Sequence, residues 1–350
     1  MSTLAMNVPE SVGAAGPFSP PGRALPTIGS NWAERTAEYA RDYAVELSAD
    51  EVVCIASALW LETVNDGRPK RLAGISPVAV EQLCAQLQWA LIPYRSGCET
   101  MLYTICMRSW MGKRMLMKLD EAVLTGAHDL TRKPVYALAD RVHHLGDLPK
   151  GTGPVLERKD EIEAELDFGG GVRRRLTLAE VLRVWQVDAD ELSCEWHMVL
   201  PCQPTAHAEG RRLLTRSALV RQFHLLRARY PGRVSGLPAL ARLRDALAVG
   251  GEEGVREHRE MLLRSFPAHG GERADMGRRA FAEGVRSLAE GAFEGVSRAA
   301  ERASRAWLAL RDLSRADAIS AAELEEAYEE LQGRERVLLD ALGRVAGGAA

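Results

Sequence analysis

The chain has 350 residues, of which 46% are hydrophobic and 27% charged, and its formal net charge is -3. This length can hold about two or three compact units, and the composition is that of an ordinary globular protein. The near balance of charge excludes a whole-chain attraction to nucleic acid or to an anionic membrane surface.

Export and membrane signals are not evident in the sequence. No run of about 18 uncharged apolar residues is present, and the N-terminus lacks a basic segment followed by an apolar one. Residues 1–29 are rich in Pro, Gly, Ala and Ser, which predicts a flexible tail. The six cysteines form no regular framework, so we expect a reducing, cytoplasmic compartment, with export by a signal-less route as the alternative.

The first predicted unit is a helical bundle over residues 30–147. Ser48 and Glu51 have the spacing of a capping box that opens a helix over 48–64. The segment 97–110 is the candidate for a central buried helix, because Arg108 is the only charge between Glu99 and Lys113. Periodicity and caps predict four further helices in this unit, over 31–47, 77–92, 113–126 and 134–145.

The second predicted unit, residues 148–270, combines a β-hairpin with helices. Apolar and polar residues alternate from Ile162 to Phe168, so 155–168 and 172–178 are predicted strands around a glycine turn. Thr177 and Glu180 are spaced as another capping box. Helices are predicted over 178–185 and 189–196, as a helix-turn-helix, then over 207–230, and from Pro238 and Glu252 onward.

The third predicted unit, residues 271–350, is a long helical hairpin. Apolar residues recur every three or four positions over 281–310 and over 324–345, and Ser320 with Glu323 caps the second arm. The predicted fold class is therefore mainly α: a multi-helix bundle with a small β-hairpin module and a C-terminal antiparallel helical hairpin.

One short stretch, "CEWHMVLPCQPTAH", has ligand spacing for a metal. Its four candidate zinc ligands are Cys194, His197, Cys202 and His207. The ligand order and the apolar Met198, Val199 and Leu200 favour a structural segment instead, because zinc knuckles carry glycines there. We therefore expect no cofactor, with zinc as the alternative.

Arginines concentrate after this stretch, where they favour either phosphate contacts or a solvated helix face. The candidate residues for binding nucleic acid or an acidic partner are Arg211, Arg212, Arg216, Arg221, Arg227 and Arg229. Combined with the zinc candidate and the helix-turn-helix, they make a nucleic-acid-binding region at 188–245 one alternative function.

Cys98 is the candidate nucleophile. Ser96 as a cap would place its thiol in the first turn of a helix, where the helix dipole stabilises a thiolate. Papain-like and transglutaminase-like enzymes use a cysteine in such a position, and this segment has that general shape. His143, His144 or His197 would serve as the base, but a strand carrying the histidine is not apparent.

The leading interpretation is a non-enzymatic scaffold, adaptor or regulatory protein that acts through protein–protein contacts. The C-terminal hairpin would self-associate or bind a partner helix through its apolar stripe, with no membrane contact. The predicted interface residues are Phe281, Val285, Leu288, Trp307, Leu324, Leu331 and Leu338. The alternatives are nucleic-acid binding and a cysteine enzyme or exported effector centred on Cys98.

Overall fold

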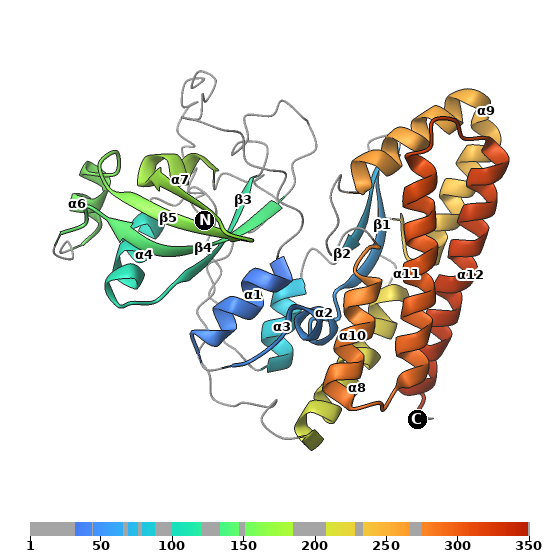
Figure 1. The fold of residues 1–350 in the computed structure, drawn as a ribbon, viewed down its shortest axis with the longest axis horizontal. Coiled ribbons are helices and arrows are strands. Elements are labelled where there is room, and N and C mark those ends of the chain that lie inside the picture. The colour runs from blue at the N-terminus through green and yellow to red at the C-terminus, as the bar shows by residue number, and fades with distance from the viewer. Residues whose placement is uncertain are drawn as a thin grey trace, which may run out of the picture.

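The fold is described by a computed structural model. It describes residues 32–43, 45–65, 69–75, 79–87, 100–120, 134–146, 151–184, 208–227, 234–266 and 275–348. Eleven helices and seven strands lie in these ranges, and the predicted mainly α fold is confirmed. Figure 1 shows a sheet part and a helical part, with α1 (Trp32–Arg41) between them.

The sheet part is a four-stranded antiparallel sheet in the order β3-β4-β5-β6. Its strands are β3 (Met115–Asp120), β4 (Pro134–His143), β5 (Glu163–Gly169) and β6 (Val172–Thr177). Helices α4 (Thr100–Trp110), α6 (Thr152–Glu157) and α7 (Leu178–Val184) share a hydrophobic cluster with one face of the sheet. Thr177 and Glu180 form the predicted capping box at α7, through hydrogen bonds of 2.9 and 3.2 Å.

Two predicted helices are wrong in this part. Residues 115–120 of the predicted helix 113–126, and 134–143 of the predicted helix 134–145, are strands. In β4, Ala137 and Ala139 belong to the cluster under the sheet, whereas Leu138 joins the cluster of the helical part. A strand buried on both faces loses its period-two pattern, so its sequence cannot be told from a helix. The predicted strand 155–168 begins only at Glu163, because 152–157 form α6.

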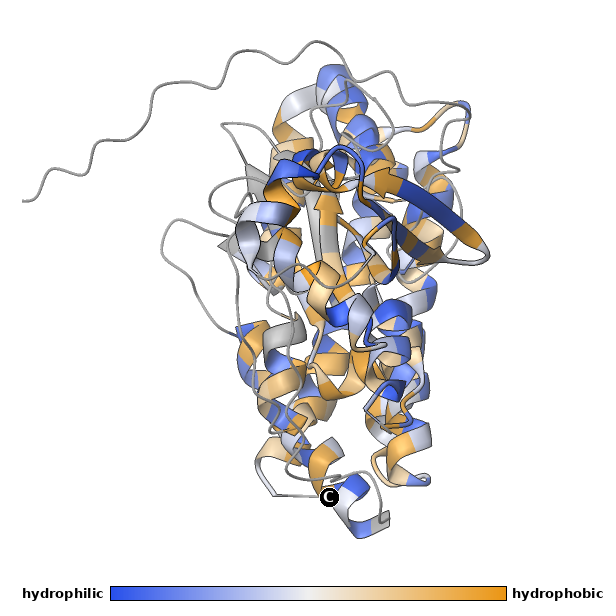
Figure 2. Ribbon diagram, turned by 90° about the vertical axis from the view of Figure 1, so that its left-hand side faces the viewer, coloured by the Kyte–Doolittle hydropathy of each residue, from blue (hydrophilic) through white to orange (hydrophobic). Residues whose placement is uncertain are grey.

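The helical part contains seven helices and a small sheet. The helices are α2 (Ala49–Ile55), α3 (Ala79–Leu87), α8 (Ala208–Arg227), α9 (Leu237–Ser265), α10 (Arg278–Ala289), α11 (Glu294–Ser314) and α12 (Ala321–Ala346). The sheet has the order β2-β1-β7, with β1 (Leu59–Asn65), β2 (Pro69–Ile75) and β7 (Val234–Ser235). The helices in view in Figure 2 carry both blue and orange residues, as amphipathic helices do when they cover a core.

The predicted helix 48–64 is correct only to Ile55. Its capping box is confirmed, with Ser48 and Glu51 hydrogen-bonded in both directions. The helix ends because Ser57 adopts a φ of 50° and donates its hydroxyl to the Ala218 carbonyl over 2.9 Å. The strand that follows is fixed by α8: the amide side chain of Gln222 accepts from Leu59 N–H at 3.0 Å and donates to its carbonyl at 2.8 Å.

The C-terminal hairpin is confirmed, with one added break. The Ser320–Glu323 capping box opens α12 as predicted. The arm before it is two antiparallel helices, α10 and α11, because Glu290 and Phe293 have φ values of 48° and 64°. The largest hydrophobic cluster joins α1 and α2 to α8, α10, α11 and α12, so the hairpin packs directly on the N-terminal helices.

A buried ion pair lies at the centre of the helical part. Arg278 is fully buried, and its Nε lies 2.8 Å from Glu335 Oε1. Trp307 Nε1 donates to the same oxygen at 2.7 Å, and Arg278 Nη1 donates to the carbonyls of Trp60 and Met276. The pair therefore connects α10, α11, α12 and β1 at one point, with its charges paired and hydrogen-bonded, as burial requires.

We predict that Glu335→Ala lowers the free energy of unfolding by about 3 kcal/mol or more, because it leaves the buried Arg278 charge unpaired. Urea or guanidinium unfolding measures the effect. The matched control is Arg334→Ala, which removes an exposed pair with Glu330 and should cost less than about 1 kcal/mol. Equal effects of the two substitutions would contradict this role of Arg278.

A second constraint is the close contact of α10 with α2. A Cβ at Gly284 would lie 2.2 Å from the Asp50 carbonyl oxygen, so only glycine permits this approach. We predict that Gly284→Ala destabilises the protein by about 1–3 kcal/mol through overpacking. Gly333→Ala, in α12 where a Cβ meets open space, should instead stabilise it by about 0.5–1 kcal/mol. Thermal and chemical unfolding of both variants would show the opposite signs.

Candidate functional site: the exposed turn after α4

Helix α4 ends in a turn that exposes two large apolar side chains. Trp110 is 63% exposed and its neighbour Met111 57% exposed. Gly112, with a φ of 66°, ends the helix in a Schellman motif: Lys113 N–H donates to the Arg108 carbonyl, and Gly112 N–H donates to the Ser109 carbonyl. The backbone of the turn is thus fixed locally, while its apolar side chains face water.

Both sides of this turn are held by other elements. On the helix side, Arg108 Nη1 donates to the Tyr43 hydroxyl over 2.9 Å. Ser109 Oγ accepts from the Val142 N–H of β4 over 2.8 Å. On the strand side, Lys113 Nζ donates to the Asp42 carbonyl over 3.2 Å. The turn is therefore held against the residues directly after α1 and against β4.

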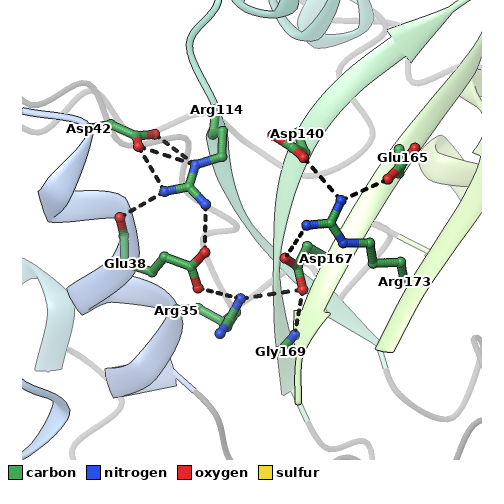
Figure 3. Close-up of polar contacts among 9 residues, drawn as sticks. All are labelled: Arg35, Glu38, Asp42, Arg114, Asp140, Glu165, Asp167, Gly169 and Arg173. Atoms are coloured by element: carbon green, nitrogen blue, oxygen red, sulfur yellow. Dashed lines mark hydrogen bonds and ion pairs between the residues drawn. The ribbon is translucent and has the colours of Figure 1, made fainter. Parts of the chain in front are cut away.

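Arg114 provides the strongest of these contacts, as Figure 3 shows. Its guanidinium lies 2.7 Å from Asp42 Oδ1 and 2.7 Å from Glu38 Oε1, and it also donates to the Glu38 carbonyl. These hydrogen bonds raise the pKa of Arg114 further above its already high value. Fork-shaped contacts of this kind fix orientation as well as distance.

Alternating charges continue from α1 across the sheet face that lies opposite to α4, α6 and α7 (Figure 3). Arg35 lies between Glu38 at 2.7 Å and Asp167 at 3.4 Å. Arg173 of β6 then lies within 3.5 Å of both Asp167 and Asp140. We call this set of side chains the charged seam, and its members are Arg35, Glu38, Asp42, Arg114, Asp140, Glu165, Asp167 and Arg173. Arg35 also lies so close to Gly169 that a Cβ there would contact its guanidinium at 2.7 Å.

Glu165 is the last carboxylate of the seam. His143 Nε2 lies 3.1 Å from its Oε2, and Arg173 Nη1 donates to its Oε1 over 3.1 Å. These hydrogen bonds, with His143 first, lower the pKa of Glu165. A carboxylate that orients an imidazole is one half of an acid–base site. Two of the described thiols are poor nucleophiles, because burial raises the pKa of Cys106 to about 12 and also raises the pKa of Cys54.

Several predicted site residues lie outside the described residues. They are the candidate nucleophile and base, the zinc candidates and one arginine: Cys98, Cys194, His197, Cys202, His207 and Arg229. Among the residues that the structure does describe, no group of three or more metal-ligating side chains is found. His143, another candidate base, lies near the C-terminal end of α4, because its neighbour Val142 contacts Ser109 in the last turn of that helix.

The predicted arginine patch divides into different environments on α8. Arg211 is an internal partner: its Nη2 lies 2.6 Å from the buried Glu51. Arg227 stacks over the Phe223 ring at 5.1 Å. Arg212 and Arg216 are exposed and Arg221 is half-buried. At least one cation of the patch therefore stabilises the fold itself.

The residues of the predicted partner-helix interface are not exposed on the described chain. All seven residues are buried in the molecule's own core: Phe281, Val285, Leu288, Trp307, Leu324, Leu331 and Leu338. Their apolar stripe packs against α1, α2, α8 and α9. Because the stripe is buried within the chain, it is not available to a second protein. Sequence periodicity shows that a face is buried and does not show what covers it.

The exposed turn was not among the predicted sites. Its signal in the sequence is "RSWMGKR", a tryptophan and a methionine directly before a helix-ending glycine, with cations on both sides.

No known protein family and no curated protein matches the sequence of this chain. Within the described ranges, no helix is long and apolar enough to cross a membrane.

The seam predicts a measurable pH dependence. Because the folded-state pKa of Glu165 lies below its unfolded value, its contribution to stability is present above that unfolded value and lost as pH falls through the folded pKa. Glu165→Gln should therefore reduce the loss of unfolding free energy between about pH 6 and pH 3. Glu161→Gln is the matched control and should have a smaller effect, because it removes an exposed ion pair with Arg158. Identical acid curves for wild type and Glu165→Gln would contradict the role of the seam.

Proposed function

We propose that this chain is a non-enzymatic adaptor that binds a protein partner through the turn at Trp110 and Met111. The observation that carries the proposal is their joint exposure. Of the large apolar side chains that are exposed in the described ranges, only these two are adjacent in sequence. Tryptophan and methionine are enriched at protein interfaces, and tryptophan is among the commonest binding hot spots.

The rigidity of the turn supports the proposal. The Schellman motif fixes its backbone, and contacts from Tyr43, Asp42 and Val142 fix its flanks. A loop that is ordered before binding loses less conformational entropy when it binds. The charged seam would thus contribute to affinity without touching the partner, by keeping the turn in one orientation.

The charges near the turn suggest the chemistry of the partner. Arg41 and Arg141 are exposed, and each directly precedes a residue that contacts the base of the turn. Lys113 belongs to the turn itself. A partner that fits would offer an apolar pocket for the two side chains and acidic residues around it, because cations at an interface rim favour an acidic partner.

The test begins with a photo-crosslinking residue at Met111 and, as control, at Leu213, which is 61% exposed on α8. A protein that crosslinks to position 111 and not to position 213 is then purified, and its affinity for the chain is measured by titration. We predict that Trp110→Ala weakens binding by about 2 kcal/mol or more, roughly 30-fold, while Leu213→Ala changes it by less than about 0.5 kcal/mol. Trp110→Ala should leave unfolding nearly unchanged, because the ring is exposed. Equal crosslinking at both positions, or full affinity of Trp110→Ala, would refute the proposal.

A further inference from the structure

A second surface feature lies on the helical part, and none of its lining residues belongs to the turn after α4. A cavity of about 330 Å³, partly open to solvent, is lined by the turn between α10 and α11, the last turns of α12 and the start of α8. These three segments come together at the lower end of Figure 1. The volume is within the range of small-molecule sites, which are about 300–1,000 Å³ and mostly apolar with a few polar groups.

The cavity combines an apolar wall with two cations. Phe293, Val296 and Val345 contribute the apolar part of the lining. Arg212 of α8 and Arg344 of α12 line it from separate helices. Within the described ranges, no hydrogen bond or ion pair engages either guanidinium.

The remaining groups at the cavity do not neutralise these cations. The carboxylate of Glu294, which also lines the cavity, is engaged by Arg298 over 2.8 Å. Helix α11 begins here without a side-chain cap, so its positive N-terminal dipole adds to the two arginines. The site therefore has a net positive end beside an apolar wall.

From this combination we infer that the cavity binds a small amphiphile, an anionic head on a short apolar tail. The head would lie between Arg212 and Arg344, since guanidinium groups bind carboxylate and phosphate through paired hydrogen bonds. The tail would lie against Phe293, Val296 and Val345. The two arginines come from different helices, so a bound anion would also connect α8 to α12.

The experiment is calorimetric titration of the full chain with octanoate, octyl phosphate and 1-octanol. Saturable binding of the two anions at one site, with no comparable binding of octanol, is expected. The tighter of the two anions would identify the source of the head, a fatty acid or a phosphoester. Binding of octanol as tight as that of octanoate would overturn the inference, because the head would then not be recognised.

The variants are chosen at exposed positions, or at positions with space for a side chain, so that a loss of binding does not result from unfolding. Arg212→Gln with Arg344→Gln should weaken the anions roughly tenfold or more, whereas Arg216→Gln, an exposed arginine of α8 outside the lining, should not. Gly295→Leu should abolish binding by filling the cavity, because Gly295 lines it and a Cβ there meets open space. Unchanged affinity in the double arginine variant, with unchanged thermal unfolding, would refute the site.

Discussion

The helical part of this protein depends on one buried ion pair, Arg278 with Glu335. A buried arginine requires a partner for its charge and acceptors for its other donors, and these come from α12, from β1 and from the residue two before it. Trp307 shares the same carboxylate. A shift of any of these elements by one residue would leave a buried charge or donor unpaired, so the pair fixes their relative positions.

The neighbouring contacts extend this arrangement outward. Asp275 caps the start of α10 through the N–H groups of Gly277 and Arg279 and accepts a hydrogen bond from Ser304. Gly284 then lets α10 lie against the backbone of α2. The hairpin and the N-terminal helices consequently share one hydrophobic cluster. A chain cut before residue 272 would therefore lose much of the core that the remaining helices need.

The sheet part joins this body through α1, and the two faces of α1 differ in chemistry. Its apolar residues, Trp32, Ala33, Ala37 and Ala40, belong to the main cluster. Its charged residues Arg35 and Glu38, with Asp42 just beyond it, form the seam with the sheet. The seam ends at the turn after α4, so the contacts that orient the sheet part also position Trp110. In the proposed function, one set of ion pairs on α1 therefore serves two purposes: it orients the sheet part, and it positions the residues that bind the partner.

The sequence alone determined the features that depend on local chemistry. The capping boxes at Ser48, Thr177 and Ser320, the glycine turn between β5 and β6 and the periodic C-terminal helices are set by residues a few positions apart. Tertiary structure decided the rest. Strand β4 is buried on both faces, so only its neighbours distinguish it from a helix. The same holds for function: the apolar stripe of α10–α12 and the pair Trp110–Met111 are both apolar in sequence. Only the packing of distant segments buries the first and leaves the second in water.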